Sequence, residues 1–415
     1  MDIELVTIGT ELLLGFTIDT NGAEIARSLA AHGVRVVRRA SIADRAEDIR
    51  DAVESALART GAVITTGGLG PTRDDITKRV VADIFGWPLE FDDTVWEALL
   101  ARFARVGRAP VASNRSQAEV PRGATVLPNQ WGTAPGLWLE GARGLVVMLP
   151  GVPHEMRNLL AHEVVPRMNG RGGGTVIASR SVRTSGIAES TLAERLGDIE
   201  DTVAPLTLAY LPGVEGVDLR LTAWNLPATE SASRLEAGVT ELRTRAGQFV
   251  YGEGSDDLAA LVVQRAREAG VRIAVAESCT GGLVGARLTA IPGSSDVFTG
   301  GVITYSDALK TLLLGVDPGV LASAGAVSEA TAKAMAEGAR ERLGADLAVS
   351  ITGVAGPGGG SEAKPVGTVW LAIAGADAAA TAVQMNFGGD RGDVRARSAQ
   401  AALLLLLRRI AAHQG

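Results

Sequence analysis

Short apolar runs alternate with amphipathic helical patterns in two separate parts of this chain. In the first part, the runs are ELVTIG, VRVVRRASI and GAVITTGG, and the helical patterns between them are GAEIARSLAAHG and AEDIRDAVESALART. In the second part, the strand pattern VRIAVAE lies between the helical patterns LAALVVQRAREAG and CTGGLVGARLTA. Such alternation is typical of parallel sheets covered by helices. We therefore predict an α/β fold that occurs twice along the chain.

Two glycine-rich stretches mark the domain boundaries. NGRGGG ends the first α/β region near residue 170, and YGEGSDD precedes the second near residue 256. Between them, residues 175–250 carry two long alternating stretches with a helix between them and another after them, which indicates a small α+β module. A chain of 415 residues also exceeds what one hydrophobic core organises. We predict two α/β domains with mainly parallel sheets, 1–170 and 256–415, joined by the α+β module 175–250.

The charge and the cysteine content restrict the function. A net charge of -7 and a pI near 5.4 argue against binding to nucleic acid or to a membrane surface. The single cysteine, Cys279, excludes an intrachain disulfide and a structural zinc cluster, and it fits a reducing compartment. The N-terminus lacks a secretory signal pattern, and the apolar run 401–407 is far shorter than the roughly 20 residues of a spanning helix. We expect a cytoplasmic protein that acts on small molecules.

Ser278 is the first candidate nucleophile. The segment IAVAESCTGGLVGARL combines a buried strand, a polar turn and an amphipathic helix. This arrangement would expose the Ser278 hydroxyl at a helix N-terminus, where free backbone N–H groups stabilise an oxyanion. The alternative is that Ser278 or Thr280 only caps the helix. Cys279 is a rival nucleophile, but it has no nearby histidine to activate it.

Lys310 is the candidate base, because a histidine base is scarce in this part of the chain. The four histidines are His32, His154, His162 and His413, and only the last, at the extreme tail, follows residue 256. A lysine whose pKa is depressed can replace histidine, whereas arginine keeps its proton. Of 40 basic residues only four are lysines, namely Lys78, Lys310, Lys333 and Lys364. Lys310 follows a strand pattern and lies in a helix capped near Ser306; the alternative is a solvated helix lysine.

Two further segments could bind phosphate. VSITGVAGPGGG is a strand that runs into a glycine-rich loop whose N–H groups could hold a phosphate, although a simple tight turn is the alternative. Arg391, at a turn before a helix, offers a positive charge to the same group, or is a surface residue. In the first domain, TTGGLGPTRDDITK suits a diphosphate with a divalent cation at Asp74 or Asp75, with Lys78 within reach of a phosphate. The alternative there is a capped helix with acidic residues in its first turn.

The C-terminal motifs AESCTGG, GGVITYSDALK, GAVSEATAKAMAEGAR, ITGVAGPGGGSEAKPVGTV and FGGDR resemble the nicotinamide mononucleotide deamidase (PncC) domain of CinA proteins. The resemblance covers residues 256–410. It implies a Ser/Lys amidohydrolase without a cofactor, in which Ser278 is the nucleophile and Lys310 the base, and in which Tyr305 and Thr280 line the site. It also implies that the loop from Gly353 to Gly358, with Ala355 and Gly356, holds the mononucleotide phosphate together with Arg391.

The N-terminal motifs IGTELLLGFTIDTNG, GGLGPTRDD, NQWGTAPG and LPGVPHEM resemble the molybdopterin-binding-like (MoaB/MogA-like) domain that begins CinA proteins. The resemblance implies nucleotide or pterin binding and, by family association, a metal-dependent ADP-ribose pyrophosphatase. The implied cations are Mg²⁺, Mn²⁺ or Co²⁺, with K⁺ as a further cation, and the implied metal ligands are Asp75 and Asp44. The implied ADP-ribose residues are Glu11, Asp19, Asn21, Gly67, Gly68, Thr72, Asp74, Lys78, Gly132 and Thr133.

The middle module resembles the KH-like domain of CinA proteins but lacks the GxxG clamp that nucleic-acid-binding KH domains use. We therefore expect a spacer or a dimer-forming element, and a homodimer. The enzyme hypothesis has two rivals. One is an adaptor in competence and recombination with a recombinase partner, which only the family name suggests, and the other is a molybdopterin-binding protein.

Overall fold

The computed structural model describes residues 1–376 and 378–413. The chain folds into two compact units. The first consists of residues 1–178 and 222–234, and the second consists of residues 179–221 and the chain from residue 235 onward. The division runs through the middle module, so the three predicted domain boundaries stay a prediction. In the described part of the chain, no helix has both the length and the apolar character that a membrane crossing requires.

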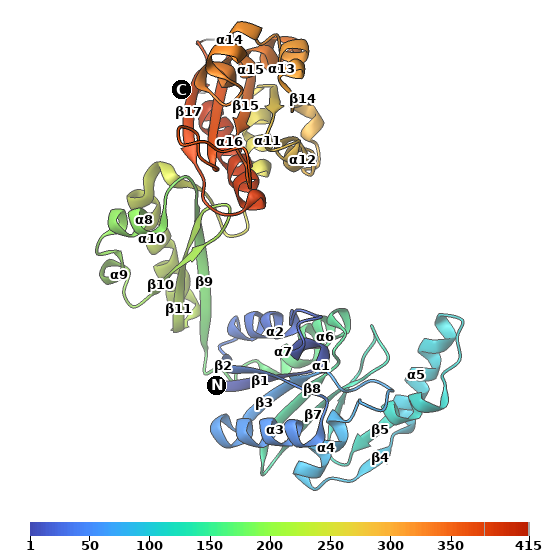
Figure 1. Cartoon of the computed structure of the whole chain (residues 1–415). Helices are drawn as coiled ribbons and strands as arrows, with labels where there is room; N and C mark the ends of the chain where they lie inside the picture. Colours follow the sequence, from blue (N-terminus) through green and yellow to red (C-terminus); the bar gives the residue numbers. More distant parts are fainter. Residues whose placement is uncertain (377, 414–415) are drawn as a thin grey trace. The chain divides into compact units, whose positions relative to one another are not determined.

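The N-terminal region is built on a six-stranded sheet in the order β2-β1-β3-β8-β7-β6 (Figure 1). The neighbours β2, β1, β3 and β8 run parallel, and β7 and β6 add an antiparallel edge. β7 and β8 form an antiparallel hairpin. The strands are β1 (Asp2–Ile8), β2 (Arg35–Ile42), β3 (Ala62–Thr66), β6 (Thr125–Leu127), β7 (Gly136–Gly141) and β8 (Gly144–Leu149), with a separate pair β4 (Leu89–Phe91) and β5 (Glu119–Pro121).

Helices cover both faces of this sheet. Along β1, Ile3 and Leu5 pack in a core with Ile25 of α2, whereas Val6 packs in a second core with Ile49 of α3. This alternation follows from the two-residue repeat of a strand. The helices are α1 (Thr10–Leu13), α2 (Asn21–Ala30), α3 (Ala46–Thr60), α4 (Thr77–Phe85), α5 (Asp93–Arg105), α6 (Pro153–Leu159) and α7 (Val165–Met168), with a 3₁₀ turn (Ala112–Ala118) and a π turn (Leu160–Val164).

The middle module is a four-stranded sheet in the order β10-β11-β9-β12, with β12 antiparallel to β9. Its α+β composition is the one predicted for residues 175–250. Its elements are β9 (Thr175–Thr184), α8 (Glu189–Leu196), α9 (Ile199–Thr202), β10 (Thr207–Pro212), β11 (Val217–Pro227), α10 (Ala228–Ala246), a 3₁₀ turn (Gly247–Phe249) and β12 (Val250–Glu253).

The C-terminal region has a five-stranded sheet in the order β14-β13-β15-β16-β17 (Figure 1). β14, β13 and β15 are parallel, and β16 and β17 continue the sheet antiparallel. The predicted α/β class is thus confirmed in both regions. The strands are β13 (Ile273–Glu277), β14 (Phe298–Ile303), β15 (Leu347–Gly353), β16 (Thr368–Gly375) and β17 (Thr381–Asn386).

Each face of this sheet is covered by its own helices. On β13, Ile273 and Val275 face a core that includes Leu403 of α16, whereas Ala274 and Ala276 face Met335 of α15. The helices are α11 (Leu258–Ala269), α12 (Leu283–Thr289), α13 (Asp307–Leu314), α14 (Pro318–Ala324), α15 (Glu329–Arg342) and α16 (Arg391–His413), with a 3₁₀ turn (Ser294–Asp296).

The parallel strands bring three predicted motifs to one edge of the sheet. Ser278 directly follows β13, the segment that leads to Lys310 follows β14, and Gly353 ends β15. Because β13 lies between β14 and β15 and all three run in the same direction, their carboxyl ends are neighbours. In open α/β sheets this edge is where ligands bind.

Candidate active site

The central feature of the C-terminal region is a contact between a buried serine and a buried lysine. Lys310 Nζ lies 3.2 Å from Ser278 Oγ and donates a hydrogen bond of 2.9 Å to the carbonyl oxygen of Thr304. Ser278 is 8% exposed and Lys310 only 1%. The lysine is therefore not the solvated helix residue of the alternative interpretation, and its amine is within reach of the serine hydroxyl.

The helix α13 positions Lys310. Its N-cap is Ser306, as the sequence predicts, and the Ser306 hydroxyl accepts a hydrogen bond of 3.3 Å from the N–H of Leu309. Burial lowers the pKa of Lys310 below its ordinary value of 10.5, because an ammonium ion loses hydration there. The Asp307 carboxylate, 3.8 Å from the amine, opposes this shift. A lysine with a lowered pKa is what a general base requires.

Glu277, next to the nucleophile, occupies the amides that begin α12. One of its carboxylate oxygens accepts hydrogen bonds from the N–H groups of Gly282 (2.9 Å) and Val284 (3.2 Å), and the other accepts from Gly285 (2.8 Å). Glu277 is 1% exposed, so its charge needs these donors. The expectation that these amides are free for an oxyanion is therefore wrong. Ser278 is also not the cap, because the N-cap position is Gly282.

Thr280 and Cys279 follow Ser278 in the same turn. Thr280 is fully buried, and its hydroxyl has no hydrogen-bond partner among the residues that the structure describes. Its carbonyl oxygen accepts a hydrogen bond of 2.8 Å from Arg395. Burial raises the pKa of the Cys279 thiol to about 11, which leaves it protonated and poorly nucleophilic.

The glycine-rich loop after β15 meets Arg391 and Tyr305. Arg391 donates one hydrogen bond of 2.7 Å to the carbonyl oxygen of Gly356 and another of 2.9 Å to the Tyr305 hydroxyl. Gly356 has a φ of +82°, and Gly358 has open space around it. Arg391 and Tyr305 are both exposed, so the pair lies at the surface of the loop. The structure thus brings the predicted phosphate loop and the predicted arginine into contact.

The first residues of the phosphate loop are tightly packed. At Gly353, a Cβ atom would lie 2.8 Å from the Thr368 carbonyl oxygen, so strand packing requires a glycine there. Ala355 is buried.

In the N-terminal region, several predicted residues gather at the carboxyl edge of the parallel strands. The Asn21 amide donates hydrogen bonds to Thr66 Oγ1 (3.1 Å) and to the Gly151 carbonyl oxygen (2.8 Å). Gly67 and Gly68 follow β3 with positive φ angles of 111° and 68°. A Cβ at either position would overlap a neighbour, at 2.1 Å and 2.0 Å respectively.

The predicted metal ligands Asp75 and Asp44 each accept hydrogen bonds from a threonine. Asp75 accepts hydrogen bonds from the N–H (2.8 Å) and the hydroxyl (2.5 Å) of Thr72. Asp44 accepts from the N–H (2.8 Å) and the hydroxyl (3.0 Å) of Thr10. Within residues 1–376 and 378–413, no group of three or more His, Cys, Asp or Glu side chains could hold a metal. A cation at either aspartate would therefore depend on the phosphates of a substrate.

Lys78 lies beside Asp75 in a pocket of about 410 Å³. Burial lowers the pKa of Lys78 to about 8, and its amine donates a hydrogen bond of 2.5 Å to the Ser116 carbonyl oxygen. Thr72 and Gly68 line the same pocket, whereas Asp74 is exposed. The structure thus brings four of the predicted residues together.

The remaining predicted residues lie elsewhere in this region. Gly132 and Thr133 line a second pocket, of about 590 Å³. The Gly132 N–H donates to the Asn129 side chain (2.8 Å). Asp19 accepts a hydrogen bond from the Gly22 N–H and pairs with Arg39 (3.0 Å). Glu11 is exposed in the first turn of α1.

The sequence interpretation missed four residues around the Ser278–Lys310 contact: Glu277, Thr304, Asp307 and Arg395. For Glu277 a signal was present, because a carboxylate that ends a buried strand before a Gly-Gly turn needs nearby donors. Asp307 also had a local signal, since it precedes Lys310 by three residues in α13, and Thr304 contributes only its backbone carbonyl. Arg395 reaches this turn through a tertiary contact and carries no comparable signal.

Three family models match successive parts of the chain. Residues 255–410 match the family model described as "CinA C-terminal domain". Residues 4–170 match the model "Probable molybdopterin binding domain", and residues 179–252 match "Damage-inducible protein CinA KH domain".

Relatives cover nearly the whole chain. A "CinA-like protein" of Gemmatimonas aurantiaca is 53% identical over 419 residues, which cover 100% of this chain and 98% of the relative. A "CinA-like protein" of Prochlorococcus marinus is 44% identical over 392 residues, which cover 94% of this chain and 91% of the relative. Among solved structures, "competence/damage inducible protein CihA" from Agrobacterium tumefaciens is 40% identical, with coverage of 38% of this chain and 94% of that chain and a TM-score of 0.36.

Proposed function

The chain belongs to the CinA family, and from this premise we propose that its C-terminal domain hydrolyses the amide of nicotinamide mononucleotide. The products are nicotinate mononucleotide and ammonia. The observation that carries the proposal is the buried contact of 3.2 Å between Lys310 Nζ and Ser278 Oγ. A serine and a lysine at this distance form an established nucleophile–base pair of acyl-transfer enzymes.

In the proposed reaction, Ser278 Oγ attacks the carboxamide carbon while the neutral Lys310 amine takes the hydroxyl proton. The tetrahedral intermediate then collapses, the C–N bond breaks, and Lys310 returns the proton to the leaving nitrogen as ammonia. A water molecule attacks the acyl-serine ester, again with Lys310 as base. The ester C–O bond breaks, Ser278 regains its proton, and the carboxylate product leaves.

Two neighbours support this chemistry. The buried Thr280 hydroxyl, which has no partner among the described residues, is the candidate donor to the oxyanion, since the amides at the start of α12 are occupied by Glu277. Arg391, held between Tyr305 and the loop carbonyl of Gly356, supplies positive charge for the mononucleotide phosphate.

The test is ammonia release from nicotinamide mononucleotide by the purified full chain. We expect Ser278→Ala to abolish release and Cys279→Ala to retain most of it, since the thiol with its raised pKa is not the nucleophile. Loss of activity in the cysteine variant together with retention in the serine variant would reject the assignment. Comparable melting temperatures of the two variants would exclude unfolding as the cause.

For the N-terminal domain we propose a second activity, metal-dependent hydrolysis of ADP-ribose to AMP. The observation that favours it is the pocket in which Lys78, with its lowered pKa, lies beside Asp75 and Thr72. Lys78 would contact a phosphate, and Asp75 would hold a divalent cation that neutralises the charge of the diphosphate. We expect Asp75→Ala to lose activity when Mg²⁺, Mn²⁺ or Co²⁺ is added in turn. Full activity in this variant would show that the metal lies elsewhere.

The same preparation distinguishes the rival functions. A molybdopterin-binding role predicts pterin binding without ADP-ribose hydrolysis, and an adaptor role predicts recombinase capture without ammonia release. A homodimer, which we also propose, is tested by light scattering of the purified chain.

A further inference from the structure

A cavity of about 620 Å³ lies in the second compact unit, away from the Ser278–Lys310 contact. One side is formed by the loops 185–189 and 212–217 of the middle module, and the other by β17 and the middle of α16. Its volume lies within the range of small-molecule sites, which often occur between structural modules.

The wall of this cavity is largely apolar. Val383 and Met385 are two residues apart on β17 and both line the cavity, as strand alternation predicts, and Phe387 continues the same surface. Leu404 and Leu405 of α16 complete it. All but Leu404 are only partly buried, so the chain leaves apolar side chains in contact with solvent here.

Two arginines of α16 give the cavity a positive charge. Arg397 donates to the Gly388 carbonyl oxygen (3.1 Å), and Arg408 donates to that of Gln248 (3.0 Å). In the part of the chain that the structure describes, neither guanidinium forms an ion pair with a carboxylate. Their positive charges therefore remain available to a ligand.

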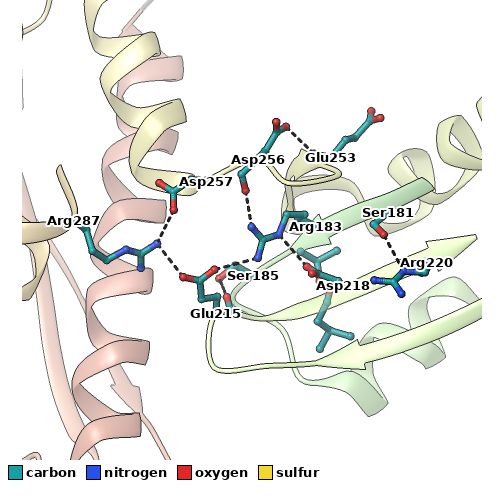
Figure 2. Close-up of polar contacts among 12 residues, drawn as sticks. Ser181, Arg183, Ser185, Glu215, Asp218, Arg220, Glu253, Asp256, Asp257 and Arg287 are labelled. Carbon is teal, nitrogen blue, oxygen red and sulfur yellow. Dashed lines mark hydrogen bonds and ion pairs between the residues drawn. The ribbon is translucent and has the colours of Figure 1, made fainter. Parts of the chain in front are cut away.

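Two carboxylates also line the cavity, and one of them is already neutralised. Glu215 pairs with Arg183 (3.1 Å) and with Arg287 (3.2 Å), as Figure 2 shows. Glu189 is exposed in the first turn of α8. The ionic contacts of Glu215 join the middle module to α12, so this side of the cavity is held in place before any ligand binds.

Gln400 provides the most specific sign of a missing partner. It lines the cavity, and its side chain is 2% exposed. Its oxygen accepts a hydrogen bond of 2.8 Å from Arg287, but its amide nitrogen has no partner among the described residues. An unpaired buried donor costs about 1–3 kcal/mol, and such groups are rare in native proteins. This nitrogen has almost no solvent-exposed surface, so an acceptor on a ligand would reach it only if neighbouring side chains moved.

We propose that this cavity binds an amphipathic organic anion, with an apolar body against β17 and α16 and an anionic group at either Arg397 or Arg408, which lie 11 residues apart on α16, about 16.5 Å along a helix. The site is distinct from the Ser278–Lys310 contact, because neither of these residues lines the cavity. The proposal does not depend on the amidase activity.

Binding is tested with 1-anilinonaphthalene-8-sulfonate, an aromatic anion whose fluorescence rises in apolar surroundings. N-phenyl-1-naphthylamine, which has the same aromatic body without the sulfonate, is the neutral counterpart. We expect saturable sulfonate binding to the full chain, and a loss of affinity of about tenfold in one of the variants Arg397→Gln and Arg408→Gln, because the single sulfonate makes a charge-assisted contact with one of the two guanidinium groups. The neutral probe should change little in these variants.

Two further variants make the result specific to the cavity. Ala188→Trp fills the exposed rim without removing a helix-capping hydrogen bond, since Ala188 makes none, and it should weaken both probes. Arg265→Gln changes an exposed arginine of α11 that pairs with Glu268, and it should weaken neither. Unchanged sulfonate binding in Arg397→Gln, Arg408→Gln and Ala188→Trp would overturn the proposal. Binding that falls as the protein concentration rises would also overturn it, because a second copy of the chain would then cover the cavity.

Discussion

The substitution Glu277→Gln tests how the fold holds the nucleophile turn. Glu277 accepts three backbone hydrogen bonds, two on one oxygen and one, from Gly285, on the other. Glutamine can keep its carbonyl toward the first pair, but its amide then faces the Gly285 N–H, donor against donor. One charge-assisted bond, worth about 1.5–3 kcal/mol, is lost, and the other two weaken to neutral bonds. Because the uncharged side chain is less costly to bury, we expect a net destabilisation of about 3 kcal/mol.

The assay is calorimetric melting of the full chain, in which the C-terminal transition is identified by loss of ammonia release after heating. A change of about 3 kcal/mol corresponds to a decrease in Tm of roughly 6–12 °C for a domain of this size. Glu341→Gln is the matched control, because Glu341 is exposed and lies 3.5 Å from Arg340; its effect should stay within about 0.5 kcal/mol. Equal melting temperatures for the two variants would refute the reasoning.

The same variant separates positioning from substrate binding. Glu277 holds the turn that carries Ser278, whereas the proposed phosphate contacts come from Arg391 on another element. We therefore expect kcat to fall and KM to change little. A higher KM with an unchanged kcat would show that Glu277 acts on the substrate site instead.

Three other predictions concern the proposed amidase. Burial lowers the pKa of Lys310, and the neutral amine is the active form, so kcat/KM should rise with pH along a limb whose midpoint lies below 10.5. A limb centred at or above 10.5 would contradict the base role. Asp307→Asn removes the carboxylate that raises the pKa of Lys310, so the rising limb should move to lower pH; movement to higher pH would exclude this coupling. Arg391→Gln should raise KM for nicotinamide mononucleotide by about tenfold to a hundredfold through loss of a charged phosphate contact, and an unchanged KM would remove Arg391 from the site.

The sequence identified the candidate site residues that follow the parallel strands of the C-terminal sheet. Once β13, β14 and β15 are recognised as parallel strands, their carboxyl ends must meet, and Ser278, Lys310 and Gly353 follow or end those strands. The scarcity of lysine also directed attention to Lys310 and Lys78, and the structure lowers the pKa of both. These inferences needed only local patterns and the geometry of sheets.

Other features depend on contacts that no local pattern encodes. The sequence around Glu277 indicates that donors lie nearby, but the three amides that supply them could be identified only in the structure. The proposed anion-binding cavity forms only when the loops near residues 186 and 214 meet α16, which lies about 200 positions further along the chain. Its incomplete hydrogen bonding at Gln400 is a property of packing in three dimensions.

The burial of Cys279 has a practical consequence for chemical labelling. It is the only cysteine of the chain, and its thiol, with a pKa near 11, has very little thiolate at neutral pH. Iodoacetamide and maleimides react through the thiolate, so the native protein should resist them. A cysteine introduced on an exposed helix could then carry a spectroscopic label at a single position without removal of the native residue. Pairs of such labels would allow distances between the two compact units to be measured in solution.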